Sequence, residues 1–322
     1  MTQVQGLKII LLSFLSFTFA CANAQVVYPY PIHTISLHME DSTVQMAYMD
    51  ASPLDHPNGK TVVLLHGKNF NGYYWKDVIA RLAKDGYRVV VPDQVGWGRS
   101  DKPVLHYSFH ALAKNTAILL DSLHIQNIIL IGHSMGGMLA ARFAMLYPSR
   151  VNKLILEDPI GLEDYKRFVP YRTTEQLTDN EMKATYASYK KYQQGYYPAW
   201  KPEYEQYVEA QAEILGDPQF KKIAHVNALT YQMIYEQPVC YEWDRLKMPT
   251  LLVIGDKDRT VVGKDQLTEE QKKVYGQYPT LGVKTKKQIP RSELIILQGI
   301  GHIPHVQDLE LFYRHLSRFI AN

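Results

Sequence analysis

Residues 126–137 read Gln-Asn-Ile-Ile-Leu-Ile-Gly-His-Ser-Met-Gly-Gly. The run 126–131 is short, apolar and rich in β-branched residues, which is typical of a strand buried on both faces. A helix-like stretch, 135–147, follows it. A Gly-x-Ser-x-Gly motif between a strand and a helix predicts a sharp turn that presents the serine hydroxyl above the sheet edge. We therefore predict Ser134 as a nucleophile; the alternative is a tight turn without chemistry.

The rest of the chain repeats this pattern of apolar runs and helix-like stretches. Further strand-like runs are 61–65, 87–92, 151–156, 250–254 and 293–297. Helix-like stretches at 74–85 and 109–123 lie between the first of them. The alternation predicts an α/β fold, with a mostly parallel sheet flanked by helices. An antiparallel start is expected at 32–49, where alternate residues share one face.

Residues 161–244 interrupt the alternation of strands and helices. This segment is polar, contains no strand-like run and carries 12 of the chain's 23 tyrosines. The strand pattern resumes at Thr250, so we expect a helical cap at 161–244, inserted between two parts of an α/β core, 25–160 and 245–322. Residues 263–290 are expected to form an added polar loop with one helix.

The composition is that of an ordinary globular protein. The 322 residues are 46% hydrophobic and 21% charged, with a formal net charge of +3, which excludes a disordered or fibrous chain. No dense basic run is present, so the sequence offers no basis for a nucleic-acid partner, and a small-molecule substrate is expected. The sequence contains no glycine-rich phosphate loop after a strand and no histidine cluster with acidic partners at ligand spacing. Neither a cofactor nor a metal is therefore expected.

The first 24 residues predict an export signal. A positive charge at Lys8 precedes an apolar-to-small run, 9–20, and residues 22–24 read Ala-Asn-Ala, a small-residue cleavage pattern. The run of about 12 residues is shorter than the ~20 that a membrane-spanning helix requires. We therefore expect cleavage after Ala24 and a periplasmic or secreted protein without a membrane span.

Two alternatives for this segment stay open. Ala20-Cys21 resembles the end of a lipoprotein signal, which would place a lipid on Cys21, although the bulky Phe19 fits that pattern poorly. The other alternative is a retained anchor. After cleavage only Cys240 is left, and one cysteine cannot form an internal disulfide.

A serine hydroxyl needs a base to remove its proton, and the base needs a carboxylate to orient it and stabilise its charged form. His302 follows the strand-like run 293–297, and Asp258 follows the run 250–254. Both therefore belong to loops that come after late strands. We predict His302 as the base and Asp258 as the acid.

Other titratable residues near these positions are assigned lesser roles. His305 is the rival base, and it is expected to pack at the rim of the site. Glu157 or Asp158 is the alternative acid. The remaining nearby groups are expected to be structural or to face away from the site: His66, His133 and Asp256.

Attack on a carbonyl creates an oxyanion, which needs N–H donors aimed at the developing charge. We predict that one donor is the backbone N–H of Met135, directly after the nucleophile. The second is the backbone N–H of Lys68, in the loop 66–69 that follows the first buried strand. The Lys68 side chain itself is expected to be a solvated group at the rim.

Together these motifs resemble the α/β-hydrolase superfamily, in its capped branch with a serine nucleophile. The similarity covers roughly 60–160 and 245–320, and its motifs are 66–67, 92–100, 132–137, 255–258 and 301–302. The chain order serine, aspartate, histidine is also that of α/β-hydrolases. Within 92–100, the resemblance implies structural roles for Asp93 and Arg99.

The resemblance implies a hydrolase. Family members that open epoxides or remove halides carry an aspartate at the position of Ser134, so the serine argues against both activities. We expect an exported, carboxylesterase-like serine hydrolase that forms an acyl-enzyme on Ser134 from small or medium, partly apolar or aromatic acyl substrates.

Three alternatives to an esterase stay open. Two use the same serine, histidine and aspartate: a carbon–carbon bond hydrolase of a diketone-like substrate, and an aminopeptidase-like hydrolase. The aminopeptidase would need acidic cap residues to hold a free amine, and Glu203, Glu205 and Glu209 are the candidates. The third alternative, from a different class, is a non-catalytic ligand-binding protein on the same scaffold.

Overall fold

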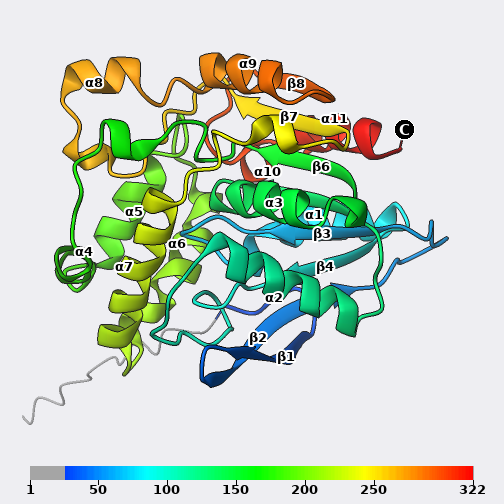
Figure 1. The fold of residues 1–322 in the computed structure, drawn as a ribbon, viewed down its shortest axis with the longest axis horizontal. Coiled ribbons are helices and arrows are strands. Elements are labelled where there is room, and N and C mark those ends of the chain that lie inside the picture. The colour runs from blue at the N-terminus through cyan, green and yellow to red at the C-terminus, as the bar shows by residue number, and fades with distance from the viewer. Residues whose placement is uncertain (1–25, 322) are drawn as a thin grey trace, which may run out of the picture.

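A computed structural model describes residues 26–321 of the chain (Figure 1). The predicted export signal, 1–24, and the alternative lipid site, Cys21, lie outside the described residues. Within 26–321, no helix combines the length and the apolar character needed to cross a membrane.

The strands of the described residues form one eight-stranded sheet in the order β1-β2-β4-β3-β5-β6-β7-β8. Their bounds are β1 Ile32–Met39, β2 Ser42–Ala51, β3 Thr61–Leu65, β4 Arg88–Pro92, β5 Ile128–His133, β6 Val151–Glu157, β7 Thr250–Gly255 and β8 Ser292–Leu297. The β1–β2 and β2–β4 pairs are antiparallel, and the other pairs are parallel. The predicted α/β fold, with its mostly parallel sheet and antiparallel start, is therefore confirmed.

Helices cover both faces of this sheet. One face is packed against α2 (Phe109–Ser122), α3 (Met135–Leu146) and α9 (Tyr278–Gln288), and the other against α1 (Lys76–Lys84) and α11 (Leu309–Ala321). Successive side chains of a strand point to opposite faces. In β3, Val63 and Leu65 therefore pack with α2 and α3, whereas Val62 and Leu64 pack with α1 and α11.

Local sequence explains how these helices begin and which face they bury. Ser108 caps α2, because its side chain accepts a hydrogen bond from the backbone N–H of Ala111. In α1, the residues Val78, Ile79 and Leu82 recur on one face at helical spacing, and all three are fully buried.

The segment between β6 and β7 is helical. It contains α4 (Thr174–Glu181), α5 (Tyr186–Gln194), α6 (Glu205–Ala212) and α7 (Phe220–Glu236). Figure 1 shows these four helices gathered at one end of the sheet, where α4 packs on α7 and α5 packs on α6. Both α4 and α5 begin with a capping box, at Thr173 and Thr185. We refer to residues 161–244 as the cap.

Residues 263–290 contain two helices rather than the single helix expected: α8 (Glu269–Val274) and α9. Helix α9 packs against β7 and β8 and is the crossover that a parallel connection between these strands requires. Its buried face consists of Tyr278, Leu281, Gly282 and Thr285. Because this pattern is only weakly apolar, sequence periodicity did not separate it from the preceding polar loop.

Candidate active site

Ser134 occupies the turn between β5 and α3, with φ 57° and ψ −120°. A positive φ is a strained conformation for a residue other than glycine. The motif glycines permit this turn: a Cβ on Gly132 would collide with the carbonyl oxygen of Gly136, and a Cβ on Gly136 would collide with that of Leu65. The strand, the tight turn and the helix thus pack against one another without room for larger residues.

The structure brings Ser134, His302 and Asp258 into one hydrogen-bonded chain. His302 Nε2 is 3.0 Å from Ser134 Oγ, and His302 Nδ1 is 2.7 Å from Asp258 Oδ2. The three residues come from the loops after β5, β7 and β8, and they are 6%, 1% and 1% exposed for Ser134, Asp258 and His302. This is the geometry in which a histidine can take a proton from a serine while a carboxylate orients its ring.

Two buried carboxyl groups at this site, Asp258 and Asp158, have pKa values shifted in opposite directions. Burial raises the pKa of Asp258, but the charge of His302 and hydrogen bonds from His302 and Thr260 outweigh it, so the pKa lies below its ordinary value. Burial and the neighbouring Asp258 charge instead raise the pKa of Asp158 well above its ordinary value. Of the two, Asp258 is therefore the more readily ionised, and the neutral form of Asp158 is favoured. The hydrogen bond of His302 goes to Asp258, which favours Asp258 over the alternative acid Asp158.

The second alternative acid, Glu157, belongs to a separate pair with His305. His305 Nδ1 lies 2.9 Å from Glu157 Oε1, and its ring stacks on Trp75 with centroids 4.1 Å apart. His305 is buried, so the expectation that it packs at the rim was wrong. The short helix α10 (Pro304–Gln307) carries His305 inward, against Trp75 at the N-cap of α1.

His133 faces away from the cavity, as expected, but its ring connects two loops of the site. The backbone N–H of Gly67 donates to the Tyr74 hydroxyl, which lies 3.0 Å from His133 Nδ1, and His133 Nε2 lies 2.7 Å from the carbonyl oxygen of His302. Burial, together with the nearby His302 and His305, holds the pKa of His133 well below its ordinary value, so the ring is neutral. A neutral ring that accepts at Nδ1 donates at Nε2 to the His302 carbonyl.

The loop that follows β3 lies directly against the nucleophile. A Cβ on Gly67 would be 3.2 Å from Ser134 Cβ, so a larger residue here would crowd the nucleophile. Among the hydrogen bonds of residues 26–321, the backbone N–H groups of Lys68 and Met135 have no acceptor. Their assignment as oxyanion donors stays a prediction.

The Lys68 side chain does not extend into solvent, which corrects the expectation of a solvated rim group. Its Nζ lies 3.2 Å from the carbonyl oxygen of Asn227 and 3.3 Å from Thr230 Oγ1, both on α7. Burial lowers the pKa of the Lys68 ammonium to about 8, although the carboxylate of Glu181 raises it. The sequence could not predict this placement, because it depends on where α7 of the cap folds over the core.

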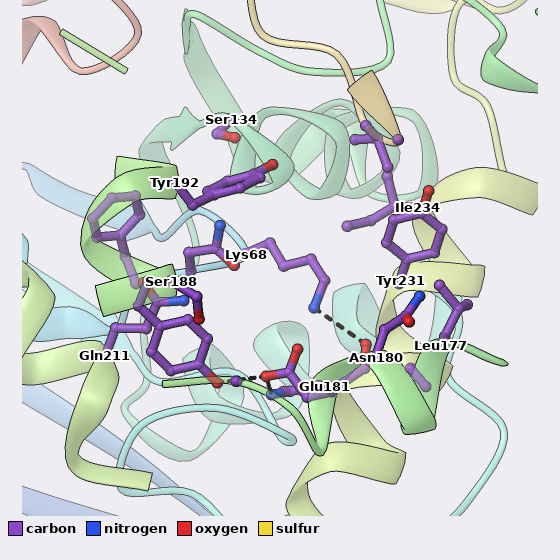
Figure 2. Close-up of a pocket in the computed structure, with 18 of the residues that line it drawn as sticks. Lys68, Ser134, Leu177, Asn180, Glu181, Ser188, Tyr192, Gln211, Tyr231 and Ile234 are labelled. Carbon is purple, nitrogen blue, oxygen red and sulfur yellow. Dashed lines mark hydrogen bonds between the residues drawn. The ribbon is translucent and has the colours of Figure 1, made fainter. Parts of the chain in front are cut away.

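A cavity of about 930 Å³ lies between core and cap and reaches Ser134. Figure 2 shows Ser134 on one wall, with Tyr192 next to it and the Lys68 side chain crossing the space toward Glu181. Apolar side chains such as Leu177 and Ile234 form another part of the wall. The first loop of the 263–290 segment also lines this cavity, at Gly263–Asp265.

A cap tyrosine that the sequence analysis did not single out contacts the candidate base. The Tyr196 ring stacks on His302 with centroids 4.9 Å apart, and its carbonyl oxygen accepts a hydrogen bond of 2.8 Å from the backbone N–H of His302. The Tyr196 hydroxyl accepts from Asn69 Nδ2 at 2.9 Å. Twelve tyrosines in the cap gave no signal for which of them touches the site.

Asp93 and Arg99 hold the loop after β4. The carboxylate of Asp93 accepts hydrogen bonds from the backbone N–H groups of Gly72 at 2.6 Å and Arg99 at 2.7 Å. Arg99 forms an ion pair with Glu213 of the cap at 3.0 Å. In the part of the chain that the structure describes, no group of three or more His, Cys, Asp or Glu is arranged to hold a metal ion.

The comparison with known families agrees with this architecture. The sequence pattern of the α/β-hydrolase fold family matches residues 60–309. The chain belongs to this family. A crystal structure of a probable hydrolytic enzyme from Pseudomonas aeruginosa PAO1 has 41% sequence identity to this chain and a TM-score of 0.90. The match covers 92% of this chain and 99% of the Pseudomonas chain.

Two named relatives of this α/β hydrolase are enzymes. Lipase 1 of Psychrobacter immobilis is 28% identical over 261 residues, which is 78% of this chain and 74% of the lipase. A 2-hydroxy-6-oxononadienedioate/2-hydroxy-6-oxononatrienedioate hydrolase of Paraburkholderia xenovorans is 38% identical over 137 residues, 41% of this chain and 46% of that enzyme. The first curated relatives that the chain matches are covered over only 30% of their length.

Proposed function

We propose that this protein is a serine hydrolase that cleaves carboxylic esters through an acyl-enzyme on Ser134. The observation that carries the proposal is the hydrogen-bonded chain from Ser134 through His302 to Asp258, with distances of 3.0 and 2.7 Å. It lies at a strained turn on the wall of a cavity of about 930 Å³. Strained backbone and a large cavity beside titratable residues are typical of catalytic sites.

In this mechanism Ser134 Oγ attacks the ester carbonyl carbon while His302 Nε2 takes the serine proton. The C–O bond to the alcohol then breaks, and His302 returns the proton to the leaving alkoxide. Water attacks the acyl-enzyme in the same way and releases the carboxylic acid and free Ser134. Asp258 stays ionised throughout and stabilises the protonated imidazole.

The backbone N–H groups of Met135 and Lys68 are the proposed oxyanion donors. In both addition steps the carbonyl oxygen gains negative charge, and donors aimed at that position stabilise it more than they stabilise the substrate. The close approach of Gly67 to Ser134, where an added Cβ would lie 3.2 Å from Ser134 Cβ, supports this role for Lys68, because it brings the following residue close to the nucleophile.

Covalent labelling tests the proposal. A fluorophosphonate probe is expected to modify wild-type protein and not Ser134→Ala, and p-nitrophenyl butyrate is expected to give a burst of one nitrophenol per site. Ser317→Ala, which changes a serine on the surface of α11, serves as the matched control and should label fully. A non-catalytic ligand-binding protein would show no adduct on Ser134 and no turnover, and would thereby replace the proposal.

A second candidate is a hydrolase of carbon–carbon bonds. It is favoured by the relative from Paraburkholderia xenovorans, whose named substrate contains an oxo group and no ester. A panel of aryl esters and vinylogous diketones separates the two candidates. Turnover of the diketones at rates well above those of the esters would favour carbon–carbon cleavage.

An aminopeptidase-like activity receives less support from the cap. Glu203, Glu205 and Glu209 are absent from the cavity wall, and Glu205 forms an ion pair with Lys190 at 2.8 Å. The acidic cap side chain whose charge acts on the Lys68 ammonium is instead Glu181. Aminoacyl anilides complete the substrate panel, and we expect no turnover of them.

We also propose that the chain is exported and cleaved after Ala24. The support is the pattern of a positive charge, an apolar run and a small-residue site in the first 24 residues. Expression of the full chain in a Gram-negative host, followed by N-terminal sequencing of the periplasmic protein, should give Gln25 as the first residue. Lipidated protein in the membrane fraction would indicate Cys21 instead, and unprocessed chain would indicate a retained anchor.

A further inference from the structure

We propose that the Lys68 ammonium binds an anionic group of the substrate, so that the preferred substrates are esters whose acyl chain carries a second, ionised carboxylate. This inference rests on the proposed ester hydrolysis and specifies its substrate class. It is carried by the position of one side chain, by its unused hydrogen-bonding capacity and by the charge of the cavity wall.

Lys68 contributes to the cavity through both its backbone and its side chain. The preceding residue, Gly67, is so close to the nucleophile that a Cβ on it would lie 3.2 Å from Ser134 Cβ, and the Lys68 ammonium lies within the same cavity, next to α7. Figure 2 shows the side chain extended across this space, away from Ser134. The Lys68 backbone N–H is the proposed donor to the ester carbonyl oxygen, and a four-carbon stem separates this backbone from the ammonium. An acyl chain with about four methylene groups between its two carbonyl carbons spans the same distance.

The ammonium group keeps one N–H for a ligand. Lysine has three donors, and the hydrogen bonds of Nζ within residues 26–321 are those to Asn227 and Thr230, at 3.2 and 3.3 Å. Both distances are at or beyond the long end of the usual range. No carboxylate oxygen of the described residues lies within 4.0 Å of Nζ. A ligand anion would thus supply the charged partner that this partly buried cation lacks.

Glu181, whose charge acts on Lys68, forms its hydrogen bonds with other residues. Its Oε1 accepts hydrogen bonds from the Tyr189 hydroxyl at 2.5 Å and from Asn227 Nδ2 at 2.9 Å. It therefore orients Asn227, whose carbonyl oxygen in turn holds the Lys68 ammonium. This arrangement positions the cation and leaves its third N–H available.

The cavity wall as a whole favours an anion. Eight basic and three acidic residues line it, although the entire chain has 35 basic and 32 acidic residues and is nearly balanced. Two of the three acidic residues, Glu213 and Asp265, are already paired with Arg99 and Arg172 at 3.0 and 2.6 Å. A concave surface with an excess of one charge concentrates ligands of the opposite charge.

The cavity also contains a buried donor without a partner, the hydroxyl of Tyr231 on α7. The Tyr231 hydroxyl lines the cavity and forms no hydrogen bond within the described residues, although buried polar atoms are almost always paired. Gly263 lies against it: a Cβ there would be 2.8 Å from the hydroxyl oxygen. We assign this hydroxyl to a polar atom of the bound substrate.

A pair of methyl esters of equal chain length tests the inference. Monomethyl adipate and methyl hexanoate differ only in a terminal carboxylate against a methyl group. Wild-type protein is expected to favour monomethyl adipate by roughly 10- to 100-fold in kcat/KM, the range of one charged hydrogen bond. The substitution Lys68→Met keeps an unbranched side chain, one atom shorter, and the backbone N–H, and should bring the ratio of the two kcat/KM values close to one. Any general damage to the site changes both rates and cancels in the ratio.

Two further variants separate a specific contact from a general charge effect. Lys68→Arg retains the positive charge and should retain a preference for monomethyl adipate. Lys183→Met removes an exposed cation from the same cavity wall and should change the ratio by less than about threefold. An equal loss of preference in both methionine variants would overturn the assignment to Lys68.

Binding without turnover distinguishes failure of this inference from failure of the proposed function. Calorimetric titration of Ser134→Ala with the two esters should show tighter binding of monomethyl adipate, and adding Lys68→Met should abolish the difference. Equal affinity of Ser134→Ala for both esters would refute the anion site, even if a fluorophosphonate labels wild-type Ser134. Conversely, absence of labelling would refute the ester mechanism, while a difference in affinity that depends on Lys68 would still support the anion site.

Discussion

His133 Nε2 lies 2.7 Å from the carbonyl oxygen of His302, so the residue directly before the nucleophile holds the loop that carries the candidate base. The other ring nitrogen of His133 is tied through the Tyr74 hydroxyl to the backbone N–H of Gly67. One buried, neutral imidazole thus connects the nucleophile turn, the loop after β3 and the loop after β8. We regard His133 as a positioning residue.

Replacing His133 tests this positioning role. His133→Phe keeps a ring of similar size but removes both hydrogen bonds, so the His302 loop loses its anchor. Because misplacement of a reacting group by about 1 Å costs on the order of 10²-fold in rate, we expect kcat toward p-nitrophenyl butyrate to fall 10- to 100-fold, with a smaller change in KM. Tyr74→Phe removes the hydrogen bonds of the Tyr74 hydroxyl but leaves the hydrogen bond between His133 and the His302 carbonyl, and should have a weaker effect. Wild-type kcat in a folded His133→Phe protein would contradict the role.

Asp258→Asn should inactivate the proposed enzyme far more than Asp158→Asn does. The amide cannot stabilise the imidazolium and favours the wrong tautomer of His302, an effect worth about 10⁴-fold in kcat for a serine protease. We expect a loss of about 10³- to 10⁴-fold for Asp258→Asn. The raised pKa of Asp158 favours its neutral form, and its carboxyl oxygens accept hydrogen bonds from the backbone N–H of Gly255, so a neutral amide there should cost less than about tenfold. Equal losses of kcat in the two variants would show that Asp258 and Asp158 share the role of the acid.

Asp158 should also make the stability of the protein depend on pH. Its folded pKa is raised by burial and by Asp258, so the stability that its protonated form contributes is complete below the unfolded pKa of about 3.9. That contribution is lost as the pH rises from the unfolded pKa to the folded pKa, by about 1.4 kcal/mol for each pH unit that separates them. Asp158→Asn removes this loss. Urea unfolding should therefore show Asp158→Asn gaining free energy of unfolding relative to wild type between pH 4 and pH 8; a difference independent of pH would contradict a raised pKa of Asp158.

Gly136→Ala should destabilise the fold, because its Cβ would collide with the backbone oxygen of Leu65, which cannot move without displacing β3. Overpacking in a core typically costs about 1–3 kcal/mol, and we expect at least the upper end of this range. Gly195→Ala is the control: its Cβ would meet only the Tyr192 carbonyl oxygen at 3.2 Å, at a position with φ −68°. Thermal melting that ranks Gly195→Ala below Gly136→Ala in stability would contradict this account.

Several features of the candidate site were predictable because they depend on short stretches of chain. The run 126–137 contains a strand, a turn and a helix start, and each follows from local preferences for apolar, glycine and helix-forming residues. His302 and Asp258 could be selected because each follows directly on a strand-like run. The weakly apolar face of α9 gave no such signal, so the second helix of 263–290 was missed.

The amino-acid order was therefore enough to predict the α/β fold, the helical character of 161–244 and three residues for one hydrogen-bonded chain. Contacts between distant segments settled the rest. His302 bonds Asp258 rather than Asp158, His305 is buried against Trp75, and the Lys68 ammonium lies under α7. Each of these depends on the direction in which a loop is held by elements that are distant in the sequence, and local propensity carries no information about that direction.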